Sequence, residues 1–142
     1  MTHRQTMIKI LLVEDHAVLR RVIRTLLEKD HRYEVCGEAA TPATALQMAR
    51  ETKPRIAVVD LSLPEGNGLD LITALKKEWP DLPVLLLTGW GESLLRTHVT
   101  ETPPDAVLGK PINQSDLLNA VAAVLRGRSE QAPTASPSAE SA

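Results

Sequence analysis

The chain is 142 residues long and 43% of them are hydrophobic, which is enough for one globular domain with a sizeable core. Its net charge of -2 and aromatic content of 2% argue against a nucleic-acid or membrane partner, because neither a basic surface nor a set of stacking rings is available. The single cysteine excludes an internal disulfide. No apolar run approaches the length of a membrane span, and the N-terminus lacks the apolar core of a signal peptide. We therefore expect a cytoplasmic protein.

Short apolar segments alternate with segments of helical periodicity, which is typical of a parallel sheet whose strands are buried on both faces. We expect the strands over Ile8–Val13, Tyr33–Ala39, Ile56–Asp60, Val84–Thr88 and Ala106–Gly109. Helices are expected over Ala17–Lys29, Pro42–Glu51, Leu69–Trp79, Glu92–Thr100 and from Asn113 to Arg126. The segment Leu61–Gly68 (LSLPEGNG) is expected to be a loop, because proline and glycine interrupt it.

Capping residues mark several helix ends. Thr41 is a suitable N-cap before Pro42, and Asn113 followed by Asp116 resembles a capping box. Gly127 is a suitable C-cap for the last helix. The remaining residues are rich in Ser, Ala, Pro and Glu without an apolar period. We therefore expect one domain over residues 1–127 and a disordered tail or linker over residues 128–142.

The alternating pattern predicts five βα units, which form a doubly wound α/β sandwich. Right-handed crossovers favour a flavodoxin-like parallel sheet with the strand order 2-1-3-4-5. In that order the first and third strands flank the point where the winding of the chain reverses. Ligands of open parallel sheets bind beyond the carboxyl ends of the strands at such a point.

Polar residues follow the strands at that edge. Glu14 and Asp15 follow the first strand and Asp60 ends the third, so three carboxylates are predicted to converge. Their mutual repulsion calls for a cation, and Mg²⁺ fits because it takes few protein ligands, all of them oxygen. Thr88 and Lys110 end the fourth and fifth strands, where a hydroxyl and an ammonium group can bind a phosphoryl oxygen.

These residues lie in the strings KILLVEDH, AVVDLSLPEGNGLDLI, VLLLTGW and VLGKPI, which occur in this order along the chain. The set resembles the receiver domain of two-component response regulators, and the resemblance covers about Ile8 to Leu125. It implies that Asp60 is the phospho-acceptor for a histidine kinase or a phosphotransfer protein. Catalysis would be limited to phosphorylation and dephosphorylation of the chain itself, so we do not expect an enzyme.

The resemblance also implies the roles of the neighbouring residues. Glu14, Asp15, Asp60 and the backbone carbonyl of Ser62 would hold Mg²⁺. Lys110 would pair with Asp60 and then with the phosphoryl group, and Thr88 would turn inward to meet a phosphoryl oxygen.

The signal would leave through the face formed by Glu92–Thr100, Ala106–Gly109 and the last helix, toward an unidentified downstream protein or a second copy of the chain. Val107 departs from the family pattern, because receivers usually carry an aromatic residue there that moves together with the threonine. Trp90 is expected either to flank the mouth of the site or to make a packing or partner contact.

Two alternatives stay open at this point. A Mg²⁺-dependent aspartyl-phosphate phosphohydrolase would also use Asp60, although such enzymes typically carry a second aspartate at the position of Ser62. The chain is alternatively the receiver part of a longer DNA-binding regulator or hybrid kinase. His16 is expected to lie at the start of a helix rather than on the metal, since Mg²⁺ prefers oxygen ligands.

Overall fold

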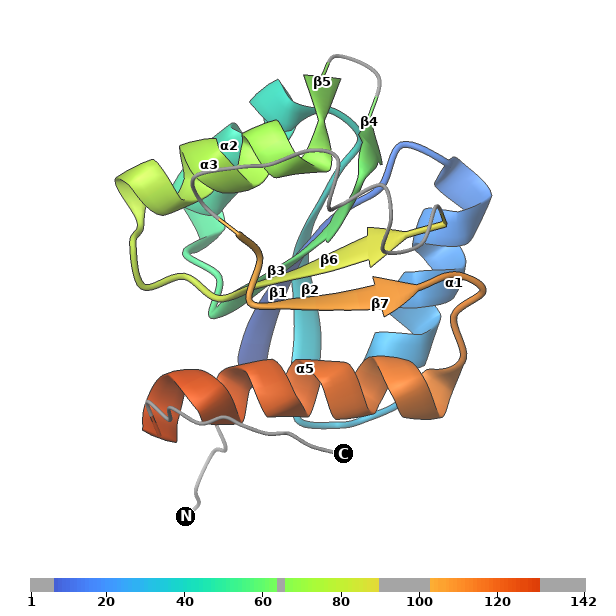
Figure 1. Ribbon diagram of the computed structural model, residues 1–142. Helices are drawn as coiled ribbons and strands as arrows, with labels where there is room; N and C mark the ends of the chain where they lie inside the picture. Colours follow the sequence, from blue (N-terminus) through green and yellow to red (C-terminus); the bar gives the residue numbers. More distant parts are fainter. Residues whose placement is uncertain (1–6, 64–65, 90–102, 131–142) are drawn as a thin grey trace.

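The computed structural model describes residues 7–63, 66–89 and 103–130. Its five longer strands are β1 (Ile8–Val13), β2 (Tyr33–Ala39), β3 (Ile56–Asp60), β6 (Val84–Thr88) and β7 (Ala106–Gly109). They form one parallel sheet in the order β2-β1-β3-β6-β7 (Figure 1). All five have the bounds predicted from the apolar runs, and the order is the predicted 2-1-3-4-5 arrangement, so the flavodoxin-like α/β fold is confirmed.

Helices cover both faces of this sheet (Figure 1). The described helices are α1 (Ala17–Glu28), α2 (Pro42–Thr52), α3 (Gly68–Glu78) and α5 (Gln114–Glu130). Side chains of a strand alternate between its two faces. Ile10 of β1 packs with Leu117 of α5 in one core cluster, whereas its neighbour Leu11 packs with Ile72 of α3 in the other. Each face of the sheet therefore has its own hydrophobic core, and the strands between them are fixed from both sides.

Side-chain caps fix the starts of three helices. The imidazole Nδ1 of His16 accepts from the backbone N–H of Leu19 at α1, and the Thr41 side chain accepts from Thr44 at α2. Asn113 Oδ1 accepts from the N–H of Asp116 at α5, 2.9 Å away. The predicted caps at Thr41 and Asn113 are confirmed, and His16 lies at a helix start as expected.

The last helix is longer than predicted. It continues through Gly127 to Glu130, so the prediction of a helix end at Arg126 with Gly127 as C-cap was wrong. Gly127 does not have a left-handed backbone, and the helix passes through it at a propensity cost of about 1 kcal/mol. Residues 128–130 of the predicted tail are therefore helical, and residues 131–142 lie outside the described residues.

The segment predicted as a loop contains two short strands, β4 (Ser62–Leu63) and β5 (Gly66–Asn67), which pair antiparallel. Helix bounds elsewhere differ from the predictions by one residue, at one end or, for α3, at both ends. The helix predicted over Glu92–Thr100 and the side chain of Trp90 lie outside the described residues. No helix in the described ranges is both long and apolar enough to cross a lipid bilayer.

Candidate functional site

Strand register brings the predicted site residues to one edge of the sheet. Val13 of β1 pairs with Val59 of β3, so Glu14 and Asp60 follow at neighbouring positions. Asp60 in turn pairs with Leu87 of β6, which places Thr88 one residue further along the same edge. The carboxyl ends of the three central strands therefore present two carboxylates and a hydroxyl side by side.

Burial sets these residues apart from an ordinary acidic surface. Glu14 is 1% exposed, Asp60 is 3% exposed and Thr88 is 2% exposed, and these are the buried polar or charged side chains of the described ranges. Asp15, by contrast, is exposed. Removing a charged group from water is costly unless it is paired, so two buried carboxylates side by side require nearby positive charge.

Lys110 supplies part of that charge. Its Nζ lies 2.9 Å from Asp60 Oδ1 and 3.5 Å from Glu14 Oε1. Its backbone N–H donates to the carbonyl of Thr88 at 2.8 Å, which attaches the end of β7 to the end of β6. The Lys110–Pro111 peptide is cis. The structure thus brings Lys110 to the two buried carboxylates, as the sequence predicts.

The electrostatics of the site follow from this arrangement. Burial and then the neighbouring Asp60 carboxylate raise the pKa of Glu14, although a backbone N–H of His16 and the ammonium group of Lys110 oppose them. Burial alone would lower the pKa of Lys110, but its ion pairs with Asp60 and Glu14 outweigh this and raise its pKa. The lysine is therefore held in its charged form, and the carboxylates still carry more negative charge than it neutralises.

The acidic residues are suited to a divalent cation. One carboxylate oxygen each of Glu14, Asp15 and Asp60 lies within 4.8 Å of the others. Oxygen ligands of Mg²⁺ lie at about 2.0–2.1 Å, so two ligands on opposite sides of the ion are about 4.2 Å apart. The three carboxylates thus fit Mg²⁺ after small movements. Ser62 follows Asp60 by two residues and starts β4, and its carbonyl as a ligand stays a prediction.

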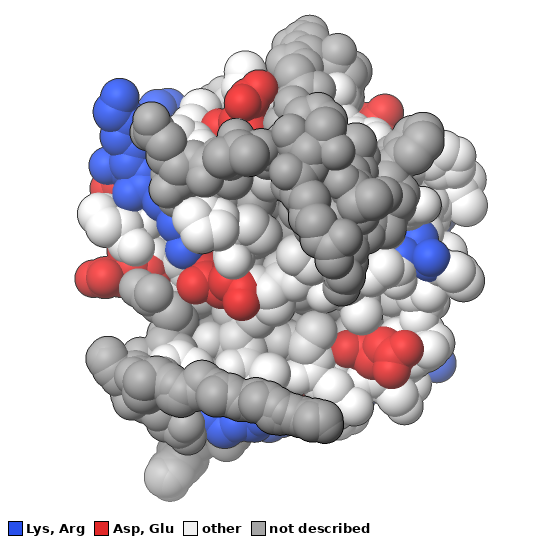
Figure 2. Space-filling view, viewed as in Figure 1, with Lys and Arg blue, Asp and Glu red and all other residues white. Residues whose placement is uncertain are grey.

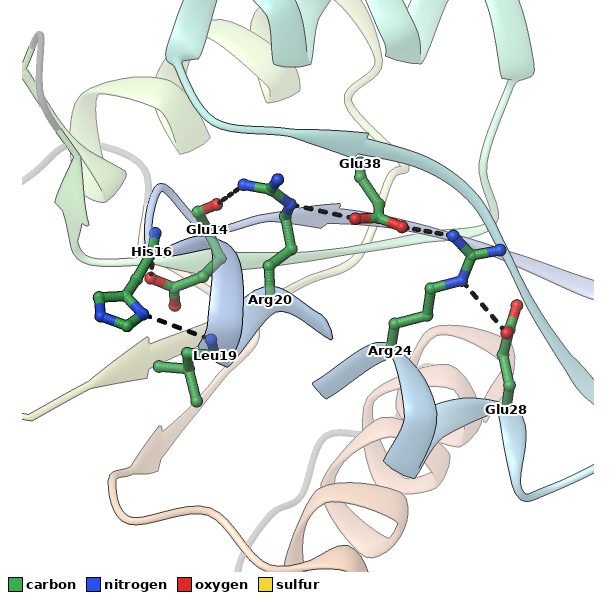
Figure 3. Close-up of polar contacts among 7 residues, drawn as sticks. All are labelled: Glu14, His16, Leu19, Arg20, Arg24, Glu28 and Glu38. Carbon is green, nitrogen blue, oxygen red and sulfur yellow. Dashed lines mark hydrogen bonds and ion pairs between the residues drawn. The ribbon is translucent and has the colours of Figure 1, made fainter. Parts of the chain in front are cut away.

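The loop from β1 to α1 is held by several polar contacts, shown in Figure 3. The backbone N–H of His16 donates to Glu14 Oε2 at 3.2 Å. The guanidinium group of Arg20 donates to the carbonyl oxygen of Glu14 at 2.8 Å, and also to Glu38 of β2 at 3.0 Å. These contacts fix both the side chain and the backbone of Glu14.

Gly68 supports the other half of the site. Its N–H donates to the carbonyl of Leu61 at 2.7 Å, and a Cβ at this position would lie 2.5 Å from the carbonyl oxygen of Asp60. The start of α3 therefore packs directly against the backbone of Asp60, at a distance that only glycine permits. Neither Arg20 nor Gly68 was predicted from the sequence as part of the site.

Val107, where the family pattern has an aromatic residue, is 41% exposed. Its neighbours in β7, Ala106 and Leu108, pack against the hydrophobic core instead. The side chain of Val107 therefore points to the opposite face of the sheet from those of Ala106 and Leu108, where it is exposed rather than in the core. Trp90, the other residue predicted near the site, lies outside the described residues.

Comparisons with known proteins agree with this geometry. A family profile described as "Response regulator receiver domain" matches residues 10–122. The chain is 36% identical over 123 residues to the DNA-binding transcriptional activator DevR/DosR of Mycobacterium tuberculosis, covering 87% of this chain and 57% of that protein. It is 35% identical over 119 residues to the transcription regulator BvgA of Bordetella pertussis, covering 84% of this chain and 56% of that protein.

Solved structures agree as well. A two-component response regulator of the LuxR family from Aurantimonas sp. is 30% identical, with a TM-score of 0.79, and the match covers 87% of this chain and 88% of that one. The chain spans a little over half the length of the curated relatives it matches. The likeness therefore concerns only a little over half of each of these relatives.

Proposed function

Because this chain belongs to the response regulator receiver family, we propose that Asp60 accepts a phosphoryl group from the phosphohistidine of a histidine kinase or phosphotransfer protein. The reaction would require Mg²⁺ and would take place in the cytoplasm. One observation carries the proposal: the buried Asp60 carboxylate lies 2.9 Å from the Lys110 ammonium and within 4.8 Å of the Glu14 and Asp15 oxygens. A nucleophile, a cation for the phosphate and a metal-ligand set thus meet at one point.

Each residue has a distinct task in this reaction. An Asp60 oxygen attacks phosphorus, so that a P–O bond forms, the P–N bond breaks and its electron pair stays on the imidazole. Lys110 pairs with Asp60 before the reaction and can bind a phosphoryl oxygen after it. The hydroxyl of Thr88 would donate to another phosphoryl oxygen. Such transfer depends mainly on positioning and on neutralisation of charge.

Mg²⁺, held by Glu14, Asp15, Asp60 and the Ser62 carbonyl, would neutralise charge on the phosphoryl oxygens during transfer. Catalysis would extend to phosphorylation and dephosphorylation of Asp60 and to no other substrate. The position of Ser62 supports this, because a hydroxymethyl side chain cannot replace the general acid of an aspartyl-phosphate phosphohydrolase.

We propose that the signal leaves through β7, α5 and residues 92–100. The backbone bond from Lys110 to Thr88 joins β7 to the phosphate-binding residue, so movement of Thr88 would be transmitted to this strand. Figure 2 shows that the surface over β7 is mostly neither acidic nor basic, which suits a protein partner or a second copy of the chain. The relative DevR/DosR is a DNA-binding transcriptional activator, which indicates an alternative, namely a DNA-binding domain joined to the same receiver.

The test is phosphorylation followed by amide NMR. Adding Mg²⁺ with acetyl phosphate, or with beryllofluoride as a mimic, should shift the amides of Asp60, Thr88 and Lys110. Asp60→Asn should show no such shift with either phosphodonor or mimic. Equal labelling of Asp60→Asn, or unchanged wild-type spectra, would overturn the proposal. Shifts that extend to Ala106–Gly109 would support the output face, and their absence would contradict it.

A further inference from the structure

Arg20 of α1 contacts the backbone between the two acidic residues of the first loop (Figure 3). Its Nη1 donates to the carbonyl oxygen of Glu14 at 2.8 Å. This carbonyl belongs to the peptide group that joins Glu14 to Asp15. The guanidinium group therefore holds the peptide that links the two acidic residues and helps to fix their backbones relative to each other.

The same arginine is itself fixed. Its Nε donates to Glu38 Oε1 at 3.0 Å, and its backbone N–H donates to the carbonyl of His16 at 2.9 Å. Ala39, next to Glu38 on β2, accepts from the N–H of Glu14 at 2.9 Å. The peptide groups on both sides of Glu14 are thus tied to the end of β2, one directly and one through Arg20.

We propose that Arg20 is a positioning residue for the divalent-cation site, which acts by fixing the Glu14–Asp15 peptide in the orientation that the ion requires. The inference rests on the proposed Mg²⁺-dependent function. Mg²⁺ demands nearly octahedral geometry, so the orientation of its ligands affects its affinity strongly. Residues that orient metal ligands typically contribute about 10- to 100-fold to metal affinity.

Positioning and charge have opposite effects on Mg²⁺ affinity, which makes the role of Arg20 testable. Arg20 is a cation near the site, so its removal should strengthen Mg²⁺ binding if only charge matters. Loss of the hydrogen bond to Glu14 should weaken binding if the peptide must be held. The direction of the change therefore separates the two effects without reference to its size.

Arg24 provides a matched control one helical turn away. It pairs with the same Glu38, through Oε2, and also with Glu28 at 3.2 Å, but none of its described bonds reaches Glu14 (Figure 3). Arg24→Met removes the same charge and breaks contacts within the same network. A purely structural contribution of the network would therefore appear in both arginine variants.

The experiment is a Mg²⁺ titration of Arg20→Met, Arg20→Lys and Arg24→Met, followed by the amide shift of Asp15, with urea unfolding measured in parallel. We expect Arg20→Met to weaken Mg²⁺ binding by about 10-fold. Arg24→Met should stay within about 2-fold of wild type, since its contacts do not include Glu14. Arg20→Lys keeps the charge but cannot serve two acceptors with a planar fork, so weakened binding is expected there as well.

Unchanged or tighter Mg²⁺ binding by Arg20→Met would overturn the inference, as would equal weakening in Arg24→Met. If Arg20→Met fails to fold, Arg20→Lys decides the question, and wild-type affinity in that variant would overturn the inference. Wild-type protein that binds no Mg²⁺ and accepts no phosphoryl group on Asp60 would instead contradict the proposed function. The two failures are therefore distinguishable within one set of titrations.

Discussion

Gly68→Ala is expected to impair both the fold and the proposed reaction, because α3 starts in direct contact with the backbone of Asp60, the proposed phospho-acceptor. The added Cβ would lie 2.5 Å from the carbonyl oxygen of Asp60 and 2.9 Å from Cα of Leu61. Ordinary contacts begin at 3.4 Å, so the backbones must separate by 3.4 minus 2.5, or about 0.9 Å. Both neighbours are backbone atoms, which have no rotamer by which to move aside.

The magnitude follows from this displacement. Overpacking of a well-packed region costs about 1–3 kcal/mol, of which alanine recovers up to about 1 kcal/mol through its helix propensity. A misplacement of about 1 Å can reduce a reaction rate about 100-fold. We therefore expect Gly68→Ala to be less stable by about 1–2 kcal/mol and to be phosphorylated on the order of 100-fold more slowly than wild type.

The assays are urea unfolding followed by circular dichroism and the initial rate of labelling by acetyl phosphate with Mg²⁺. Gly127→Ala is the matched control, since nothing lies within 4 Å of a Cβ there and the residue is inside α5. It should be more stable than wild type by about 0.5–1 kcal/mol and be phosphorylated at the wild-type rate. A Gly68→Ala protein with wild-type stability and rate would refute the reasoning.

Lys110→Met should bind Mg²⁺ several-fold more tightly in a titration, because no ammonium group competes for Asp60. The rate of its labelling by acetyl phosphate should nevertheless fall about 100-fold. Weaker Mg²⁺ binding by this variant would contradict the expected competition. Burial would raise the pKa of Glu38, but hydrogen bonds from two α1 arginines outweigh it and lower that pKa from 4.5. Glu38 therefore contributes stability above about pH 4.5, and this stability is lost as the pH falls through its lowered pKa in the folded protein. In that pH range the urea midpoint of Glu38→Gln should fall less steeply than that of wild type or of the exposed control Glu34→Gln. Asn113→Ala removes the cap of α5 and should cost about 1 kcal/mol in urea unfolding, and an unchanged midpoint would show that the cap contributes nothing.

The strands could be predicted from the sequence because their signal is local. A strand buried on both faces is an uninterrupted apolar run, and Ile56–Asp60 or Val84–Thr88 has clear ends in the sequence alone. The convergence of Glu14 and Asp60 follows from strand order, so the centre of the site was predictable once the order was known.

Other features depend on contacts that sequence spacing does not reveal. Arg20 and Glu38 are 18 residues apart and meet only because α1 packs beside β2. The importance of Gly68 comes from the closeness of the carbonyl oxygen of Asp60. The only sequence signal for it was a glycine at the end of the segment Leu61–Gly68. Gly127 led to the wrong prediction of a helix end, because a glycine C-cap has a left-handed backbone and Gly127 does not.

The two outer strands of the sheet limit how copies of this domain can join. Within the described strands, β2 and β7 each pair with one neighbour, so each has a free edge. β7 is four residues long, and the register of β2 against β1 shifts between Ile10 and Leu11. Short or irregular edge strands are poor templates for another strand, so the sheets of two copies are protected from pairing edge to edge. Association of this domain should therefore use side-chain surfaces, including the proposed face over β7 and α5, which phosphorylation can alter without adding strands to the sheet.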